Sequence, residues 1–327
     1  MINRRTFIGG GGALLLASAY PSLGQAQPRN QTGRLVFGLP TGSTGERLAK
    51  GLLGVLDSQF DTYYELDTVD SRNTLQAAER VKRANADGAT LLHVQSAPMV
   101  LFPSMYRSLG YAPLTDFTPI AALGDYCYAL VVGPAVPTQV KSVDQYLAWV
   151  RLNPDYRDLG FTLYGSQGHL ITLMLARTKE VALRPQSYSS VNPLASDLKS
   201  ASLAAGIVVA GSNGSLLDPA VRILAVSGKE RMAALPNVAT FVEQGVQDLD
   251  IGGWYGWFAP ANLSSGAHQA LVKKVSAAQA TAQFSQLQKD LSLKPVSLTP
   301  AQIGERVARE MQEYKRLVSS YRLTQIV

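Results

Sequence analysis

Short apolar runs alternate with stretches of helical periodicity along the first part of the chain. The runs have the length of strands and lie at Leu35–Gly38, Tyr63–Leu66, Thr90–Val94, Pro119–Leu123 and Ala129–Val132. Helical patterns at Glu46–Ser58 and Asn73–Ala86 separate the first three runs, and each keeps its apolar residues on one side. This alternation predicts a parallel sheet that is covered by helices on both faces.

A second set of α/β elements follows. Ser142 and Gln145 form a capping-box pattern, which predicts a helix that ends near Leu152. Later strands are predicted at Gly160–Tyr164, Arg184–Tyr188, Ile207–Ala210, Arg222–Val226 and Gly253–Pro260. Later helices are predicted at His169–Lys179, Pro193–Ala204, Gly266–Thr281 and Ala282–Leu291, and a closing helix is predicted from the Thr299 cap to about Tyr321. Trp254 and Trp257 on the last strand are predicted core residues.

The turn between the first strand and the first helix is rich in Gly, Ser and Thr. Its candidate ligand-binding residues are Thr41, Gly42, Ser43, Thr44 and Gly45. Backbone N–H groups, hydroxyls and the positive end of a helix dipole all favour an anion, either a carboxylate or a phosphate. No Walker A or dinucleotide glycine pattern is present, so a nucleotide is not indicated. An ordinary N-capped turn is the alternative.

Two other turns are candidates for the same site. One also lies at the carboxyl end of a strand, and the other also connects a strand to a helix. Ligands of parallel sheets bind outside the carboxyl ends of strands, which adds Gln95, Ser96 and Ala97 after the third strand. The turn Gly165–Gly168 again follows a strand and opens a helix. Two such turns in successive α/β units can face one cleft.

The first 26 residues have the pattern of a signal peptide. Arg4 and Arg5 form a twin-arginine pair, and an apolar stretch runs from Ile8 to Ala19. Gly24-Gln25-Ala26 then supplies the small residues of a cleavage site. We expect cleavage near Ala26 and export to the periplasm, by either the twin-arginine or the general route; a membrane anchor is the weaker alternative. Lys and Arg then fall from 30 to 28 against 24 acidic residues, so the net charge becomes +4.

The remaining composition excludes several classes of function. The basic residues are scattered, so no nucleic-acid partner is expected. Cys127 is the single cysteine, and its apolar context predicts a buried small hydrophobe rather than a nucleophile. His93 is predicted to be a satisfied core or loop residue, and His268, which begins a surface helix, is predicted to be solvated. Three dispersed histidines and one cysteine form no metal pattern, and no cofactor is expected.

Several motifs together carry a family resemblance. They are Ala86–Leu92, Tyr111–Ile120, Arg222–Ser227, Leu235–Gly245 and Trp254–Pro260. In this order and spacing the chain resembles the periplasmic receptors of tripartite tricarboxylate transporters, often called the Bug family. The resemblance implies a type II periplasmic-binding-protein fold, with two α/β domains around a cleft joined by two crossover strands. It implies a first domain of residues 33–132 and 254–327, a second of 133–253, and hinges near Val132-Gly133 and Gly252-Gly253.

The resemblance also implies the site and the function. It adds Gly165, Ser166, Gln167, His169, Tyr188, Ser190 and Asp197 as ligand-binding residues of the second domain. The implied protein is a monomeric, non-catalytic receptor that captures a small organic carboxylate and delivers it to integral-membrane transporter subunits. Several features depart from the family: Glu46 stands where Asp is usual, the Gly165–Gly168 turn is shortened, and Ser43, Thr44, Ala201 and a serine of Tyr188-Ser189-Ser190 stand where glycines are usual. The identity of the ligand therefore stays open.

Alternatives remain at the level of function and of single residues. A receptor that presents its ligand to a membrane sensor kinase would need the same cleft. An exported hydrolase is less favoured, because this sequence contains no Gly-x-Ser-x-Gly motif. For His169, packing or capping is favoured over ligand contact. Asp197 is favoured as a capping or solvated residue, and Tyr188 fits the cleft and the core equally well.

Overall fold

The computed structural model describes residues 33–69, 74–211 and 219–326. The predicted signal peptide lies outside these residues. The helices are α1 (Thr44–Phe60), α2 (Leu75–Lys82), α3 (Ser96–Val100), α4 (Phe102–Met105), α5 (Val143–Leu152), α6 (Gln167–Thr178), α7 (Val191–Lys199), α9 (Ser265–Gln279), α10 (Ala282–Asp290) and α11 (Pro300–Ser320), with a 3-10 turn at Pro154–Tyr156. Among the described residues, no helix combines the length and the hydrophobicity that crossing a membrane requires.

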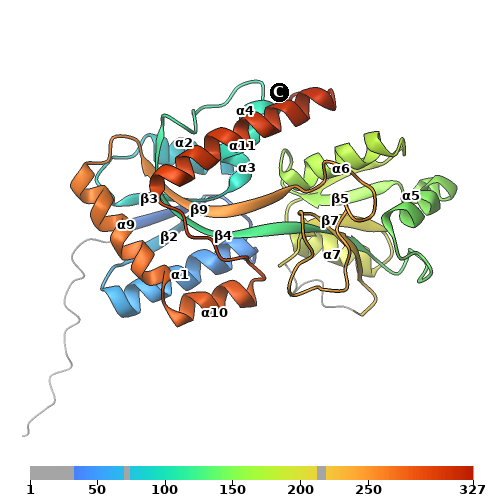
Figure 1. Cartoon of the computed structure of the whole chain (residues 1–327), viewed down its shortest axis with the longest axis horizontal. Helices are drawn as coiled ribbons and strands as arrows, with labels where there is room; N and C mark the ends of the chain where they lie inside the picture. Colours follow the sequence, from blue (N-terminus) through green and yellow to red (C-terminus); the bar gives the residue numbers. More distant parts are fainter. Residues whose placement is uncertain (1–32, 70–73, 212–218, 327) are drawn as a thin grey trace, which may run out of the picture. The chain divides into compact units, whose positions relative to one another are not determined.

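The strands join into one mixed sheet. They are β1 (Gly33–Phe37), β2 (Tyr64–Thr68), β3 (Thr90–Gln95), β4 (Phe117–Val132), β5 (Asp158–Thr162), β6 (Arg184–Tyr188), β7 (Ala205–Val209), β8 (Arg222–Val226) and β9 (Gly252–Pro260). Their order is β2-β1-β3-β9-β4-β7-β5-β6, and β8 pairs with β4. Figure 1 shows β4 and β9 running side by side through the middle of the sheet. Pairing is parallel at β2-β1-β3 and β7-β5-β6 but antiparallel where β9 and β4 meet their neighbours. The parallel pairing expected for the first part of the chain is therefore confirmed for β1, β2 and β3 and wrong for β4.

The long strand β4 replaces two predicted strands. Residues 117–127 of β4 pair with β9, and from Tyr128 onward β4 pairs with β7. The register shifts between Pro119 and Ala121 and again between Ala122 and Gly124, and Gly124 has a φ of +149° that favours glycine. These irregularities let one strand bend past two sets of partners. The division of the chain into two domains stays a prediction.

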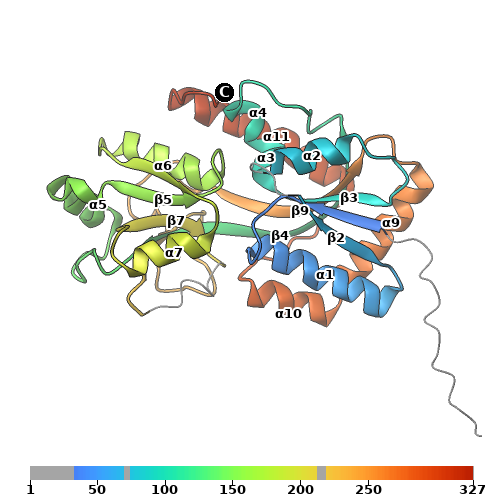
Figure 2. The ribbon, with the colours of Figure 1, turned by 180° about the vertical axis from the view of Figure 1, so that it is seen from behind.

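Helices cover both faces of each part of the sheet. Helix α1 packs against α9 and α10, and α11 packs against α3, α4 and β4. Helices α6 and α7 both contact β5 and β7, and lie on opposite sides of these strands (Figure 2). The α9–α10 segment is two helices rather than one bent helix, because the Thr281 hydroxyl accepts a hydrogen bond from Phe284 N and caps α10.

The core contains the predicted aromatic residues. Trp254 and Trp257 are 1% and 0% exposed. The Trp257 indole Nε1 donates to His93 Nδ1 at 2.9 Å, and burial lowers the pKa of His93 to about 3. His93 is thus a neutral core residue, as predicted, although its Nε2 has no hydrogen-bond partner among the described residues. The prediction for His268 is wrong: it is partly buried and its Nε2 lies 3.0 Å from the Pro119 carbonyl oxygen.

Candidate functional site

A small cavity lies where turns and strand ends from both parts of the sheet meet. Its volume is about 50 Å³, and its lining is Leu39, Pro40, Thr41, Ser43, Thr44, Gln95, Thr162, Leu163, Ser190, Val191, Val209 and Tyr255. At roughly 10–15 Å³ for each water, this is room for about four water molecules. No charged side chain belongs to the lining within the part of the chain that the structure describes. Hydroxyls and one amide supply its side-chain polar groups.

The turn after β1 reaches the cavity through Thr41, Ser43 and Thr44. Ser43 is the N-cap of α1, and its hydroxyl accepts a hydrogen bond from Glu46 N at 3.2 Å. The Glu46 carboxylate in turn accepts from Gly42 N at 2.5 Å and pairs with Lys50 at 2.8 Å. Burial opposes ionisation of Glu46, but the hydrogen bonds from Lys50 and Gly42 outweigh it and lower the pKa.

This arrangement decides which residues of the turn face the cavity. Gly42 N is occupied by the protein's own carboxylate, and neither Gly42 nor Gly45 lines the cavity. The positive end of α1 is presented instead by Ser43 and Thr44.

At the end of β3 only one of three candidates lines the cavity. Gln95 lines it, and its Oε1 accepts a hydrogen bond from the Tyr126 hydroxyl at 3.2 Å. Ser96 and Ala97 are fully buried and do not line it. The Ser96 hydroxyl oxygen accepts from Gln167 Nε2 at 2.8 Å and from Trp254 N at 3.3 Å.

The Gly165–Gly168 turn lies behind the cavity wall. Ser166 is the N-cap of α6: its hydroxyl accepts from His169 N at 3.4 Å and donates to the Thr162 carbonyl at 2.9 Å. His169 Nδ1 accepts from Gly165 N at 3.2 Å, and the His169 ring stacks on the Tyr164 ring at 4.4 Å. Burial lowers the pKa of His169 to about 4, so the ring is neutral near pH 7.

His169 is therefore a capping and packing residue. Gly165, Ser166, Gln167 and His169 do not line the cavity, whose wall on this side is Thr162 and Leu163.

The start of α7 contributes Ser190 and Val191 to the lining. Ser190 is the N-cap residue of α7, yet its side chain makes no capping hydrogen bond. Tyr188 and Asp197 do not line the cavity, and the Tyr188 hydroxyl donates to Asp197 Oδ2 at 2.8 Å. Burial and this hydrogen bond raise the pKa of Tyr188.

Six lining residues were missed by sequence reasoning. They are Leu39, Pro40, Thr162, Leu163, Val209 and Tyr255. Val191 lies in the segment Tyr188–Asn192, to which the resemblance points. Four of the six lie within three residues of the Thr41–Gly45 and Gly165–Gly168 turns, so the predicted segments were too short. Val209 and Tyr255 lie within strands and carried no signal of a site, since an apolar or aromatic strand residue is usually a core residue.

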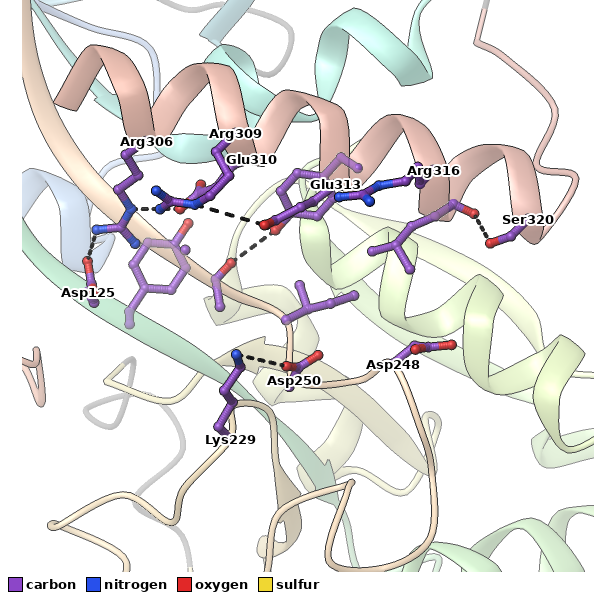
Figure 3. A pocket seen from close by; sticks show the side chains of 16 residues that line it. Asp125, Lys229, Asp248, Asp250, Arg306, Arg309, Glu310, Glu313, Arg316 and Ser320 are labelled. Atoms are coloured by element: carbon purple, nitrogen blue, oxygen red, sulfur yellow. Dashed lines mark hydrogen bonds and ion pairs between the residues drawn. The ribbon is translucent and has the colours of Figure 1, made fainter. Parts of the chain in front are cut away.

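A larger groove lies elsewhere, along α11. Its volume is about 760 Å³, and charged residues line much of it (Figure 3). The charges pair with one another: Arg306 contacts Asp125 at 2.8 Å and Glu310 at 2.6 Å, and Lys229 lies 4.0 Å from Asp250. None of the predicted ligand-binding residues lines this groove. The smaller cavity is therefore the candidate site.

Metal and thiol chemistry have no support at the site. In the described ranges no group of three or more His, Cys, Asp or Glu residues is able to hold a metal ion. Cys127 is partly buried, and burial raises the pKa of its thiol to about 11, so little thiolate exists at neutral pH.

Comparison with known proteins identifies the family and the fold. The family model described as tripartite tricarboxylate transporter family receptor matches residues 69–323. The structure of Rpa4515 from R. palustris with adipate has a TM-score of 0.84 at 23% identity, covering 91% of this chain and 99% of that chain. The periplasmic binding protein BugD has a TM-score of 0.82 at 21% identity, covering 91% and 99%.

MatC from Rhodopseudomonas palustris with bound malate has a TM-score of 0.80 at 22% identity, covering 88% of this chain and 99% of that chain. At these identities the likeness shows the fold alone. It confirms the predicted class, an α/β fold of the periplasmic-binding-protein type.

Proposed function

This chain belongs to the family of tripartite tricarboxylate transporter receptors, and on that basis we propose that it captures a small organic carboxylate in the cavity described above. The family consists of receptors, not enzymes. Delivery of the ligand to integral-membrane transporter subunits, export to the periplasm after cleavage near Ala26, and a monomeric state belong to the same proposal.

The observation that carries the proposal is the meeting of two helix N-termini at one cavity. Helix α1 presents Ser43 and Thr44 there, and α7 presents Ser190 and Val191. A helix N-terminus carries a partial positive charge and unpaired N–H groups, so two of them favour a negatively charged ligand. The hydroxyls of Thr41, Thr162 and Ser190 add neutral donors that suit carboxylate oxygens.

The size of the cavity adds a requirement for movement. Ligand sites generally enclose about 300–1,000 Å³, well above the 50 Å³ found here. Rpa4515 holds adipate and MatC holds malate, and both ligands are dicarboxylates. We therefore include in the proposal a rotation between the two predicted domains, residues 133–253 and residues 33–132 with 254–327, in which residues 128–132 move with the second domain because they pair with β7. Gly252 and Gly253, opposite Cys127 and Tyr126, would absorb the backbone change.

A thermal-shift screen tests the proposed function. The panel contains mono-, di- and tricarboxylates, each paired with its uncharged amide or alcohol analogue. A ligand present at one hundred times its dissociation constant stabilises the fold by about 2.7 kcal/mol, which gives a measurable rise in Tm. We expect at least one carboxylate to raise Tm while its uncharged analogue does not. A panel without any carboxylate effect would contradict the proposal, as would equal effects of acids and analogues.

Delivery is tested separately in cells. Deletion of the gene is expected to abolish uptake of the carboxylate found in the screen, and the full-length chain is expected to restore it. Restoration by a chain that lacks residues 1–26 would contradict export through the predicted signal peptide.

A further inference from the structure

Two tyrosines flank the point where β4 changes its partner. Cys127 is the last residue of β4 to pair with β9, opposite Gly252, and Tyr128 is the first to pair with β7, opposite Val209. Tyr126 and Tyr128 lie on either side of Cys127, two residues apart, so both side chains point to the same face of the strand. Their rings lie 5.7 Å apart. A rotation between the two parts of the sheet would therefore act on β4 near this point.

The hydroxyls of these tyrosines lead to the turns after β3 and β5. Tyr126 donates to Gln95 Oε1 at 3.2 Å, and Tyr128 donates to Gln167 Oε1 at 3.3 Å. Gln167 Nε2 then donates to the Ser96 hydroxyl oxygen at 2.8 Å. These hydrogen bonds form two groups, Gln95–Tyr126 and Tyr128–Gln167–Ser96, and the contact between the two tyrosine rings joins them. We call the five residues the hinge network. Its members range from 0% to 5% exposed.

Both crossing strands take part in the network. The tyrosines belong to β4, and the backbone N–H of Trp254, on β9, donates to the Ser96 hydroxyl oxygen at 3.3 Å. Ser96 belongs to the part of the sheet that contains β1 to β3, and Gln167 follows β5 in the other part. The bond between Ser96 and Gln167 therefore fixes the two parts directly beside the crossing strands.

Gln95 is the one member of the hinge network that lines the cavity. Both polar atoms of Gln167 are bonded within the protein, and neither Ser96 nor Gln167 lines the cavity. Breaking their bond would leave buried polar atoms without partners, which is unfavourable. Gln95 does line the cavity, and it is joined to the crossing strand through Tyr126.

We propose that the hinge network couples ligand contact at Gln95 to the angle between the two parts of the sheet. Ser96 and Gln167 are thus positioning residues that hold the closed cleft, and they act without touching ligand. A ligand that bonds to the Gln95 amide fixes the orientation in which its oxygen accepts from Tyr126, which favours the closed arrangement. The inference rests on the proposed function only in that the ligand occupies this cavity.

Three tyrosine-to-phenylalanine variants test the coupling. Tyr126→Phe and Tyr128→Phe each remove one hydroxyl of the network and keep the ring. Tyr111→Phe is the matched control, because Tyr111 is 5% exposed and its hydroxyl donates at 2.8 Å to the Pro98 carbonyl, outside the network. We expect the two network variants to raise the Kd of the carboxylate found in the screen by about 2- to 12-fold, the range implied by one net hydrogen bond. The control should keep the wild-type Kd.

A second readout needs no ligand. Hydrogen exchange of the Trp254 N–H reports on the network, because this group donates to Ser96. Tyr128→Phe should speed its exchange through the loosening of Gln167, and Tyr111→Phe should not. The double variant Tyr128→Phe/Ser96→Ala should weaken binding by less than the product of the single effects, since both act on Gln167.

The outcomes separate this proposal from the proposed function. If the wild-type protein binds no carboxylate, the proposed function is contradicted. Hydrogen exchange of the Trp254 N–H then tests the hinge network on its own. Network variants that bind ligand like Tyr111→Phe, with unchanged Trp254 exchange, would overturn the coupling even if carboxylate binding is established.

Discussion

Ser43 and Ser190 allow ligand contact to be separated from helix capping. Both are N-cap residues that line the cavity, the first of α1 and the second of α7. The Ser43 hydroxyl accepts from Glu46 N at 3.2 Å, whereas the Ser190 side chain makes no capping hydrogen bond. Replacement by alanine therefore removes a cap at one position only.

The expected magnitudes follow from this difference. Loss of a serine N-cap costs about 1 kcal/mol, which corresponds to a fall in Tm of about 1.5 °C for a chain of this length. Ser43→Ala should show that fall, and Ser190→Ala should melt like the wild type. A hydrogen bond to a charged carboxylate contributes about 1.5–3 kcal/mol, so loss of the Ser190 hydroxyl should raise Kd by about 10- to 100-fold.

The assay combines differential scanning fluorimetry with titration calorimetry of the carboxylate found in the screen. Ser264→Ala is the matched control: Ser264 caps α9 by accepting from Ala267 N at 3.3 Å and does not line the cavity. It should lower Tm like Ser43→Ala and leave Kd unchanged. The reasoning is refuted if Ser190→Ala binds ligand as the wild type does, or if it loses as much stability as Ser43→Ala.

Two further predictions concern stability. The pKa values of buried His93 and His169, about 3 and about 4, lie below the value of about 6.5 of an unfolded histidine. The unfolded chain thus binds protons that the folded chain does not, and the free energy of unfolding should fall as pH drops from about 6.5 toward 4, by about 1.4 kcal/mol per pH unit for each ring. Urea unfolding at pH 7.5 and 5.5 measures this fall, and His169→Gln should make it shallower; an equal slope in that variant would contradict the assignment. Gly165→Ala should destabilise the fold by more than Gly42→Ala, because both glycines have positive φ (+84° and +80°) but only at Gly165 would the new Cβ meet a neighbour, the Tyr106 ring at 3.0 Å. Equal urea midpoints for the two variants would show that this contact relaxes freely.

Local signals in the sequence predicted the elements well. The pattern Thr299-Pro300-Ala301-Gln302 does form a capping box, with the Thr299 hydroxyl accepting from Gln302 N and the Gln302 side chain accepting from Thr299 N. Ile303, Val307 and Tyr314 on the same helix are buried, and Met311 is partly buried. These features depend on residues three or four positions apart, so the sequence alone specifies them.

Non-local features could not be predicted in this way. The continuity of β4 depends on partners more than seventy residues away, and the apolar runs on either side of Gly124 looked like two strands. His268 was placed in solvent because it begins a surface helix, yet it meets the Pro119 carbonyl 149 residues earlier. The Ser96–Gln167 bond likewise joins residues that are 71 positions apart. No local pattern carries such a contact.

The candidate site shows why polar turn residues are ambiguous in a sequence. Hydroxyl and amide groups that bind a ligand are the same groups that cap helices and join buried turns. Ser166 and Gln167 satisfied the pattern of a ligand cradle, but their hydrogen bonds are internal. Ser190 satisfied the same pattern and faces the cavity without a capping bond. Only the positions of their partners in the fold distinguish the two cases.

The turn after β1 gives independent physical support for anion recognition. The Glu46 carboxylate is almost buried, and burial alone would raise its pKa. The pKa is nevertheless lowered, because Lys50 and Gly42 N donate hydrogen bonds to the carboxylate. The start of α1 thus already stabilises one negative charge at a position with little access to solvent. A ligand carboxylate that meets Ser43 and Thr44 enters the same helix terminus, while the Lys50 ammonium offsets the Glu46 charge and limits its repulsion of the ligand.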